Sequence, residues 1–243
     1  GWLKVVKDGK IHGSINPNGA VTGRATHAYP NIAQVPSLSA PYGQECRELF
    51  TVPQGWKLMG ADASGLELRC LGHFTSAYDG GSYVKELLEG DIHTANQIAA
   101  GLPNRDSSKR FIYAFLYGGG DQLIGELVGG SRKQGKAIKE RFLRKTPALA
   151  KLRDQVMISS ERGFIYGLDR RRVHIRSPHS ALNALLQSAG GIICKQWLVQ
   201  FVKAMKAAGF KHGWDGDFAM CAWVHDEIQV ACKAEIAEQV GEI

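Results

Sequence analysis

The segment Gly60-Ala61-Asp62-Ala63-Ser64-Gly65-Leu66-Glu67-Leu68-Arg69 decides the fold, because it places a carboxylate where an apolar run ends. The run from Trp56 to Ala61 predicts a short, mostly buried strand, and a helical pattern starts after Ser64-Gly65 and continues to Phe74. Corners between a strand and a helix often expose a functional side chain. Aspartate is also a common helix cap, so this segment alone leaves both roles open for Asp62.

Composition places the chain among globular proteins with a basic surface. Its 243 residues can bury a substantial core, as one large domain or as one domain with an insertion. Lys and Arg number 30 against 23 Asp and Glu, for a net charge of +7, which favours a polyanionic partner without requiring one. The five cysteines are scattered and odd in number, which indicates reduced structural thiols rather than disulfides or a zinc site.

Neither a membrane-spanning stretch nor a signal peptide is recognisable in the sequence. The first residue is Gly rather than Met. We therefore expect an intracellular protein with no membrane partner, and a chain that is a piece of a longer one.

The first 36 residues predict antiparallel sheet and loops. Asp8-Gly9 lies between alternating residues, which is a strong hairpin signal, and Asn16-Pro17-Asn18-Gly19 predicts a second turn. The loops that follow carry hydrogen-bonding side chains of the kinds that position phosphates and contact groove edges, although such residues are often only solvated. These side chains are Thr22, Arg24, Asn31 and Gln34.

The most informative predicted helix begins after Asn104 and stops at Gly118. Arg105, Lys109, Tyr113 and Tyr117 follow one another at four-residue spacing, so they form one continuous stripe along the helix. Two cations followed by two aromatic rings suit a nucleotide, with charge for a triphosphate and rings for a sugar or base. A solvated helix face with tyrosines at its buried edge is the alternative.

Two further helical regions flank this stripe. Asp91 is expected to cap a helix over 92–100 whose first turn carries His93, in a position to meet an anion. The region 121–157 is helical in pattern and strongly basic, with a break at Thr146-Pro147. Such a surface fits a nucleic-acid backbone, and it also fits plain solubility.

The last third of the chain predicts a hairpin around 167–171, a long helix from about 179 to 208, and a second hairpin. On the long helix, Asn183 and Gln187 share a face and suit the hydrogen-bond acceptors of a DNA minor groove. The second hairpin joins strands 219–224 and 228–231 through His225-Asp226-Glu227. Side by side, strand-end Asp62 and Asp226 would form an oxygen site for two magnesium ions roughly 3.5–4 Å apart.

Three motifs in this order resemble those of family A, or DNA polymerase I-like, DNA polymerases. Asp62 to Arg69 resembles motif A, Arg105 to Gly118 resembles motif B, and His225-Asp226-Glu227 resembles motif C. With Thr22-Gly23-Arg24 and the Asn183 to Gln187 pair, the resemblance covers nearly the whole chain, and it is strongest to the replicative polymerases of short-tailed bacteriophages. It implies an α+β fold, in which a palm with an antiparallel sheet and packed helices carries an inserted helical fingers subdomain. The expected segments are palm over 1–88, fingers over 89–163 and a second part of the palm over 164–243.

The resemblance also implies roles for individual residues. Asp62, Asp226 and the main-chain carbonyl of Ala63 would hold two Mg²⁺ ions, with Glu227 as an auxiliary carboxylate. Glu67 would lie beneath the sugar of the nucleotide and exclude a 2′-hydroxyl. The triphosphate would be bound by Arg105, Lys109 and His93, with Lys109 at the leaving pyrophosphate, while Tyr113 would stack near the sugar and base and Tyr117 by the template base.

The partners implied are dNTPs and primer–template DNA, whose minor groove and primer end would be contacted by Arg24, Asn31, Gln34, Asn183, Gln187 and His225. The expected reaction is attack of the primer 3′-hydroxyl on the α-phosphate of a dNTP, in the cytoplasm of a phage-infected bacterium. A processivity factor and a helicase–primase are candidate partners of the full-length parent.

Some features depart from the family pattern. No exonuclease domain, thumb or final palm segment is recognised in the chain, so the fragment alone is expected to lack full activity. The loop from Asn31 to Gln34 departs from the cellular DNA polymerase I pattern. A single-subunit RNA polymerase, a metal-dependent nuclease and a non-catalytic DNA-binding fragment are the alternatives, and Glu67 argues against the first of them.

Overall fold

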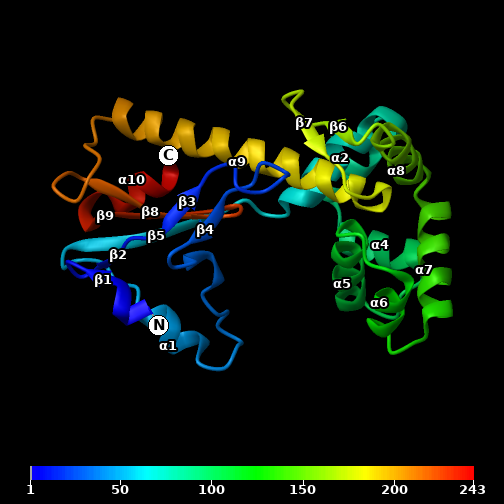
Figure 1. Cartoon of the computed structure of the whole chain (residues 1–243), viewed down its shortest axis with the longest axis horizontal. Coiled ribbons are helices and arrows are strands. Elements are labelled where there is room, and N and C mark those ends of the chain that lie inside the picture. Colours follow the sequence, from blue (N-terminus) through cyan, green and yellow to red (C-terminus); the bar gives the residue numbers. More distant parts are fainter. Residues whose placement is uncertain (1) are drawn as a thin grey trace. The chain divides into compact units, whose positions relative to one another are not determined.

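The computed structural model describes residues 2–243, which cluster into two compact units. The first unit comprises the residues up to Ser64 together with Gly191–Ile243, and the second unit comprises Gly65–Gly190. Helix and sheet are mixed, as expected for an α+β chain (Figure 1). The second unit extends beyond the 89–163 segment expected for fingers, because helices on both sides of that segment pack within it.

The first unit is built around a three-stranded antiparallel sheet with the order β5-β9-β8 (Figure 1). Short hairpins and turns precede it along the chain, and the C-terminal helix packs against β5 and β9. The elements before the sheet are η1 (Trp2–Val5), β1 (Val6–Lys7), β2 (Lys10–Ile11), β3 (Ser14–Asn16), β4 (Thr26–Ala28), η2 (Ile32–Gln34) and α1 (Gly43–Glu48). The sheet and the elements after it are β5 (Trp56–Asp62), β8 (Phe218–Val224), β9 (Glu227–Lys233), η4 (Ala234–Ile236) and α10 (Ala237–Glu242).

The expectation that 56–61 is a mostly buried strand was wrong. β5 exists and ends at Asp62 as predicted, but it lies at the edge of the sheet and none of its residues is buried. Leu58 is 43% exposed although it is apolar. An apolar run predicts a strand, but its burial depends on which elements cover it, and here the interior strand is β9, with Ile228, Val230, Ala231 and Cys232 buried.

The predicted N-terminal turns are confirmed. Asp8 and Gly9 both have positive φ, at 52° and 71°, which is the backbone of the Asp-Gly hairpin turn between β1 and β2. In the next turn, the side chain of Asn16 accepts a hydrogen bond of 3.1 Å from the backbone N–H of Asn18. These turn residues therefore form the turns that the sequence indicated.

The second unit is mainly helical (Figure 1). The break predicted at Thr146-Pro147 separates α7 from α8, with the Thr146 hydroxyl donating to the carbonyl of Phe142 at 2.7 Å instead of capping α8. The predicted hairpin around 167–171 is also present. The elements are α2 (Leu66–Asp79), α3 (Ser82–Glu89), α4 (Ile92–Ala100), α5 (Arg105–Leu116), α6 (Asp121–Glu126), α7 (Arg132–Lys145), α8 (Pro147–Ser160), β6 (Phe164–Tyr166), β7 (Arg172–His174), η3 (Pro178–Ser180) and α9 (Ala181–Ala207), and α9 continues into the first unit.

An aromatic cluster positions helix α5 within the second unit. Phe142 of α7 is fully buried and meets the rings of Phe111 and Phe115 edge-on, at centroid distances of 5.1 and 5.4 Å. Ile112 and Leu116 complete the buried face of α5. These four α5 residues hold the helix to the body of the unit, and their burial leaves the opposite stripe of the helix for other contacts.

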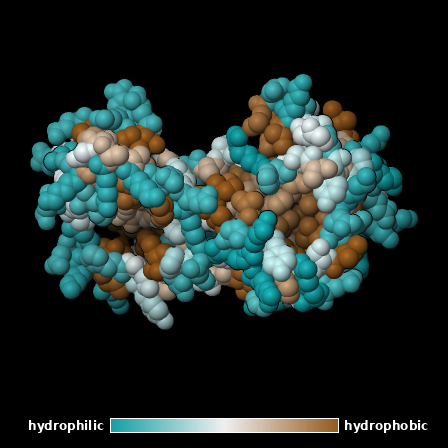
Figure 2. Space-filling view, turned by 90° about the horizontal axis from the view of Figure 1, so that it is seen from above, coloured by the Kyte–Doolittle hydropathy of each residue, from teal (hydrophilic) through white to brown (hydrophobic). Residues whose placement is uncertain are grey.

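The five cysteines lie outside any disulfide, and three of them are buried. Hydrophilic groups cover much of the face shown in Figure 2, with apolar groups interspersed. None of the helices within 2–243 combines the length and the apolar character needed to cross a membrane.

Candidate active site

The first unit brings the two strand-end aspartates to the same end of its sheet. Asp62, the last residue of β5, pairs in register with Glu227, the first residue of β9, and Asp226 directly precedes Glu227. The backbone N–H of Ala63 donates a hydrogen bond of 3.0 Å to the carbonyl of Asp226. Residue Gly65, and not Asp62, occupies the N-cap position of α2. The capping alternative for Asp62 is therefore wrong.

The donor atoms at this corner are hard oxygens of the type that Mg²⁺ prefers. Within residues 2–243, no three His, Cys, Asp or Glu side chains are clustered as a metal site. Glu227 accepts a hydrogen bond from Gln229 Nε2, so its carboxylate is engaged by the protein. Mg²⁺ is commonly held by one or two carboxylates together with substrate phosphates, and the pair Asp62 and Asp226 fits that donor set.

The backbone of β5 lies close to a side chain of β9 beside these carboxylates. Gly60 on β5 lies opposite Gln229 on β9, and a Cβ at position 60 would lie 2.7 Å from Gln229 Nε2. Glycine at this position therefore leaves room for the side chain of Gln229, which donates to Glu227 two residues earlier on the same strand. The sequence motif around Asp62 contained this glycine, but only the register shows which side chain lies against it.

The turn that carries Asp226 is also held by aromatic residues. His225 has a φ of 56°, and its carbonyl accepts a hydrogen bond of 3.2 Å from Trp223 Nε1. Burial lowers the pKa of His27 on β4, and the charge of His225 lowers this pKa further. Sequence reasoning placed His225 at the primer end but gave no role to His27, because the contact joins residues almost 200 positions apart.

The predicted groove residues of the first unit lie on and near its N-terminal loops. Asn31 is half-buried and its Oδ1 accepts a hydrogen bond of 3.0 Å from the backbone N–H of Ala33, so this side chain caps η2, where Gln34 is exposed. Arg24 is also half-buried and packs beside Gly191 of α9. Lys195 Nζ donates a hydrogen bond of 2.6 Å to the carbonyl of Gly23 and so connects this loop to α9. Sequence reasoning missed this hydrogen bond.

In the second unit, the stripe of cations and tyrosines is present on α5. Asn104 caps this helix by accepting a hydrogen bond of 2.8 Å from Ser107 N–H. Arg105 and Lys109 are exposed and Tyr113 is half-buried. Tyr117 is the C-cap residue, one position beyond the end of the helix. Three members of the stripe therefore lie on the helix itself and the fourth at its end.

Glu67 and Tyr117 are joined directly. The Tyr117 hydroxyl donates a hydrogen bond of 3.1 Å to Glu67 Oε1. Glu67 lies in the first turn of α2 and is only 8% exposed, which is unusual for a carboxylate without a partner. The bond links the residue expected beneath the sugar to the residue expected beside the template base. No sequence pattern indicated this link, because 50 residues separate the two.

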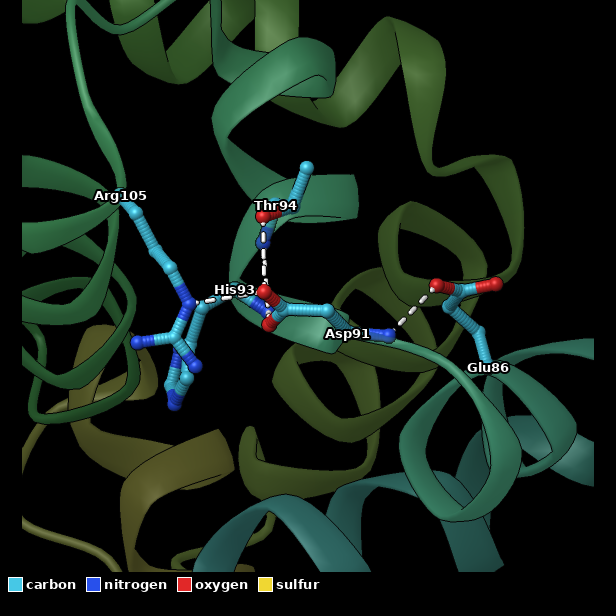
Figure 3. Close-up of polar contacts among 5 residues, drawn as sticks. All are labelled: Glu86, Asp91, His93, Thr94 and Arg105. Carbon is cyan, nitrogen blue, oxygen red and sulfur yellow. Dashed lines mark hydrogen bonds and ion pairs between the residues drawn. The ribbon is translucent and has the colours of Figure 1, made fainter.

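Arg105, Asp91 and His93 form a second charged group, at the N-terminus of α4 (Figure 3). Arg105 Nε donates to Asp91 Oδ2 at 2.7 Å. The bonds from Arg105 and Thr94 hold the pKa of the Asp91 carboxyl well below its usual range. Burial lowers the pKa of His93, and the positive charges of Arg105 and Lys109 lower it further. The predicted cap role of Asp91 is confirmed, but its ion pair with Arg105 was not foreseen.

Asn183 and Gln187 lie one turn apart on α9, in the part of the helix that belongs to the second unit. Both are half-buried, whereas Leu182, Leu185 and Leu186 around them are buried. The amide pair is thus on a partly accessible face of the helix, as its spacing indicated.

Comparison with known proteins assigns this arrangement to a family. The family described as DNA polymerase family A matches residues 2–243. The chain belongs to DNA polymerase family A. This family A chain is 54% identical to the DNA-directed DNA polymerase of Escherichia phage T7, over 98% of the chain and 37% of that polymerase. It is also 54% identical to the DNA-directed DNA polymerase of Enterobacteria phage T3, over 100% of the chain and 38% of that polymerase.

A solved structure shows the same fold. The polymerase domain of Pol1 from M. smegmatis, in complex with a DNA primer-template and a dNTP, matches with a TM-score of 0.82 and 22% identity. The match covers 99% of the family A chain and 45% of that domain's chain. The chain thus spans less than half the length of the relatives it matches.

Proposed function

We propose that this chain is the palm and fingers part of a template-directed DNA polymerase, which transfers a nucleotidyl group from a dNTP to the 3′-hydroxyl of a primer. The observation that carries the proposal is the register of β5 and β9, which puts the Asp62 and Asp226 strand ends together. Membership of family A and the 54% identity to two phage DNA-directed DNA polymerases support it.

Two Mg²⁺ ions would be held by Asp62, Asp226 and the main-chain carbonyl of Ala63, with Glu227 as an auxiliary carboxylate. When bound, such ions lower the pKa of the attacking hydroxyl and neutralise charge on the transferred phosphate. The protein's own contribution is to keep the two aspartates at one sheet end. The strand register and the hydrogen bond from Ala63 N–H to the Asp226 carbonyl supply that order.

The triphosphate would be bound by the exposed cations Arg105 and Lys109 and by the half-buried His93, all in the second unit. Arg105 and Lys109 project from successive turns of α5, and His93 lies in the first turn of α4. Because the α5 cations follow one stripe, they can contact neighbouring phosphates of one nucleotide. Lys109 would offset the charge that develops on the leaving pyrophosphate.

Sugar and template selection would depend on the two tyrosines and Glu67. Tyr113 would stack against the sugar and base, and Tyr117 would stack against the template base. Glu67 is buried and held by Tyr117, so its carboxylate has little freedom to move away from a 2′-hydroxyl. A fixed side chain that leaves no room for this group excludes ribonucleotides.

The primer–template would be contacted by Arg24, Asn31, Gln34, Asn183, Gln187 and His225. The M. smegmatis neighbour, solved with primer-template DNA and a dNTP, supports these two partners. We place the reaction in the cytoplasm of a phage-infected bacterium, since two relatives are phage polymerases. A processivity factor and a helicase–primase are proposed partners of the full-length protein only.

Primer extension by the full-length protein that carries this sequence tests the proposal. We expect magnesium-dependent extension with dNTPs and none with a chelator present. Glu67→Ala should raise the ratio of rNTP to dNTP incorporation by about 10²-fold, since rejection of one added hydroxyl is worth that much in a shaped pocket. Glu89→Ala, at an exposed glutamate on α3, is the matched control and should leave the ratio unchanged.

Three results would favour the alternatives. Equal use of rNTPs and dNTPs by the parent would indicate an RNA polymerase-like enzyme. Degradation of the primer without extension would indicate a nuclease. Binding of primer–template without either reaction would indicate a non-catalytic DNA-binding protein.

A further inference from the structure

Asp91 accepts hydrogen bonds from the side chain of Arg105 and from the backbone of the helical turn that carries His93, and both residues belong to the proposed triphosphate site. Asp91 Oδ2 accepts hydrogen bonds from Arg105 Nε at 2.7 Å and from Thr94 Oγ1 at 2.8 Å. Asp91 Oδ1 accepts from the backbone N–H groups of His93 at 3.1 Å and Thr94 at 3.4 Å. One carboxylate therefore fixes the guanidinium of Arg105 and the first turn of the helix that carries His93.

Asp91 is itself held from the preceding helix. Glu86, near the end of α3, accepts a hydrogen bond of 3.1 Å from the Asp91 backbone N–H (Figure 3). Gly90 between them permits this approach, because a Cβ at position 90 would collide with the Glu86 carboxylate. The carboxylate of Asp91 is thus supported from α3 as well as from its own helix.

Arg105 binds Asp91 through Nε, which leaves the two terminal nitrogens of Arg105 available. The bond uses Nε, and the two terminal nitrogens of Arg105 point away from Asp91, on the side where His93 lies (Figure 3). Terminal nitrogens of arginine form the fork that binds phosphate oxygens in pairs. An ion pair through Nε thus orients the fork without occupying it.

We propose that Asp91 is a positioning residue for triphosphate binding, because it holds Arg105 through Nε with its terminal nitrogens turned toward the His93 side. The proposal rests on the proposed function of this site as the triphosphate-binding part of a polymerase. It adds a residue of negative charge to a site expected to bind an anion. That negative charge makes the test decisive, because its removal should lower the KM for dNTP if only electrostatics matters and raise this KM if positioning matters.

The test is steady-state primer extension by Asp91→Asn in the full-length protein. Asparagine is as good an N-cap as aspartate, so the helix is retained while the ion pair is lost. Removing a negative charge near a bound triphosphate should by itself lower the KM for dNTP. Loss of positioning should instead raise this KM, and we expect a rise of about fivefold with kcat changed by less than about twofold.

Asp106→Asn is the matched control. Asp106 lies next to Arg105 on α5 and is exposed, but none of the hydrogen bonds or ion pairs described for residues 2–243 joins it to Arg105. We expect Asp106→Asn to leave the KM unchanged or to lower it slightly. A fall or no change in KM for Asp91→Asn, or an equal rise in both variants, overturns the proposal.

A double mutant separates positioning of Arg105 from a structural effect on the fold. Arg105→Lys keeps the positive charge but removes Nε, so adding Asp91→Asn to Arg105→Lys should have less than about twofold further effect on KM. A full fivefold effect in that background would show that Asp91 acts in another way. If Asp91→Asn fails to fold, Asp91→Ser, which also caps helices well, takes its place.

Binding of inorganic triphosphate distinguishes failure of this inference from failure of the proposed function. If the parent extends primers but Asp91→Asn has an unchanged KM, only the inference is wrong. If the parent does not extend primers, calorimetric titration with inorganic triphosphate still decides the inference. Weaker binding by Asp91→Asn than by Asp106→Asn supports it, and equal binding or none by the parent overturns it.

Discussion

In the first unit, the candidate metal ligands lie where two paired strands of a sheet meet, whereas in the second unit the candidate phosphate-binding cations lie on the exposed face of a helix whose opposite face is buried. Asp62 and Asp226 are placed by strand register and a main-chain hydrogen bond. Arg105 and Lys109 are placed by the burial of Phe111 and Phe115 against Phe142 of α7 in the same unit. A sheet end fixes where two backbones meet, while a helix face fixes the spacing of side chains along one element.

The two arrangements differ in what a substitution can disturb. At the end of the sheet, a side-chain substitution leaves the strand pairing intact. Its effect on activity can therefore be separated from its effect on stability. On the helix, the exposed stripe depends on the buried stripe, so loss of packing displaces the cations.

The largest expected effect is on the sheet end. Asp226→Asn should reduce primer extension by about 10³-fold or more, because one of two metal-binding carboxylates is lost. Binding of primer–template, measured by fluorescence anisotropy, should stay within about twofold of the parent value. The matched control is Asp215→Asn, at an exposed aspartate in the loop before β8. Retained extension by Asp226→Asn would support a non-enzymatic DNA-binding module instead.

A stability measurement probes the second unit. Phe142→Ala should lower the free energy of unfolding by about 3–5 kcal/mol, since it removes a fully buried ring and leaves a cavity against two phenylalanines. Ile98→Ala, at a side chain that is 75% exposed on α4, should cost less than about 0.5 kcal/mol. Denaturant titration followed by circular dichroism measures both. Similar costs for the two variants would mean that packing against α7 does not hold α5.

The smallest of these effects concerns one hydroxyl group on the α5 stripe. We expect the Tyr113 hydroxyl to compensate for a missing 3′-hydroxyl on the nucleotide. Tyr113→Phe should therefore discriminate about 5- to 100-fold more strongly against dideoxynucleotides, which is the range for one buried hydrogen bond. Tyr166→Phe, at an exposed tyrosine on β6, is the control. Equal discrimination by Tyr113→Phe and the parent rules this role out.

Sequence patterns predicted the elements well where a local rule determines the structure. Asp62 at a strand end, the Asp8-Gly9 turn and the cap at Asp91 each depend on residues close in sequence. The four-residue spacing from Arg105 likewise predicted which side of α5 is buried. These features follow from backbone geometry and periodicity.

Other features depend on contacts between distant segments, and sequence patterns did not reveal them. The exposure of β5 is set by its position at the edge of the sheet, which the order of strands determines. The bond from Tyr117 to Glu67 and the tie from Lys195 to Gly23 join residues 50 and 172 positions apart. The ion pair of Arg105 with Asp91 required the packing of α4 on α5.

The bond between Tyr117 and Glu67 has a practical consequence for anyone who redesigns this protein. On the roles proposed above, one end of the bond checks the sugar of the incoming nucleotide and the other end faces the templating base. Opening the site to nucleotides with modified sugars by replacing Glu67 would also release the ring that faces the template. A broader choice of sugars and accurate copying would then trade off against each other, and a useful variant would need a new partner for Tyr117.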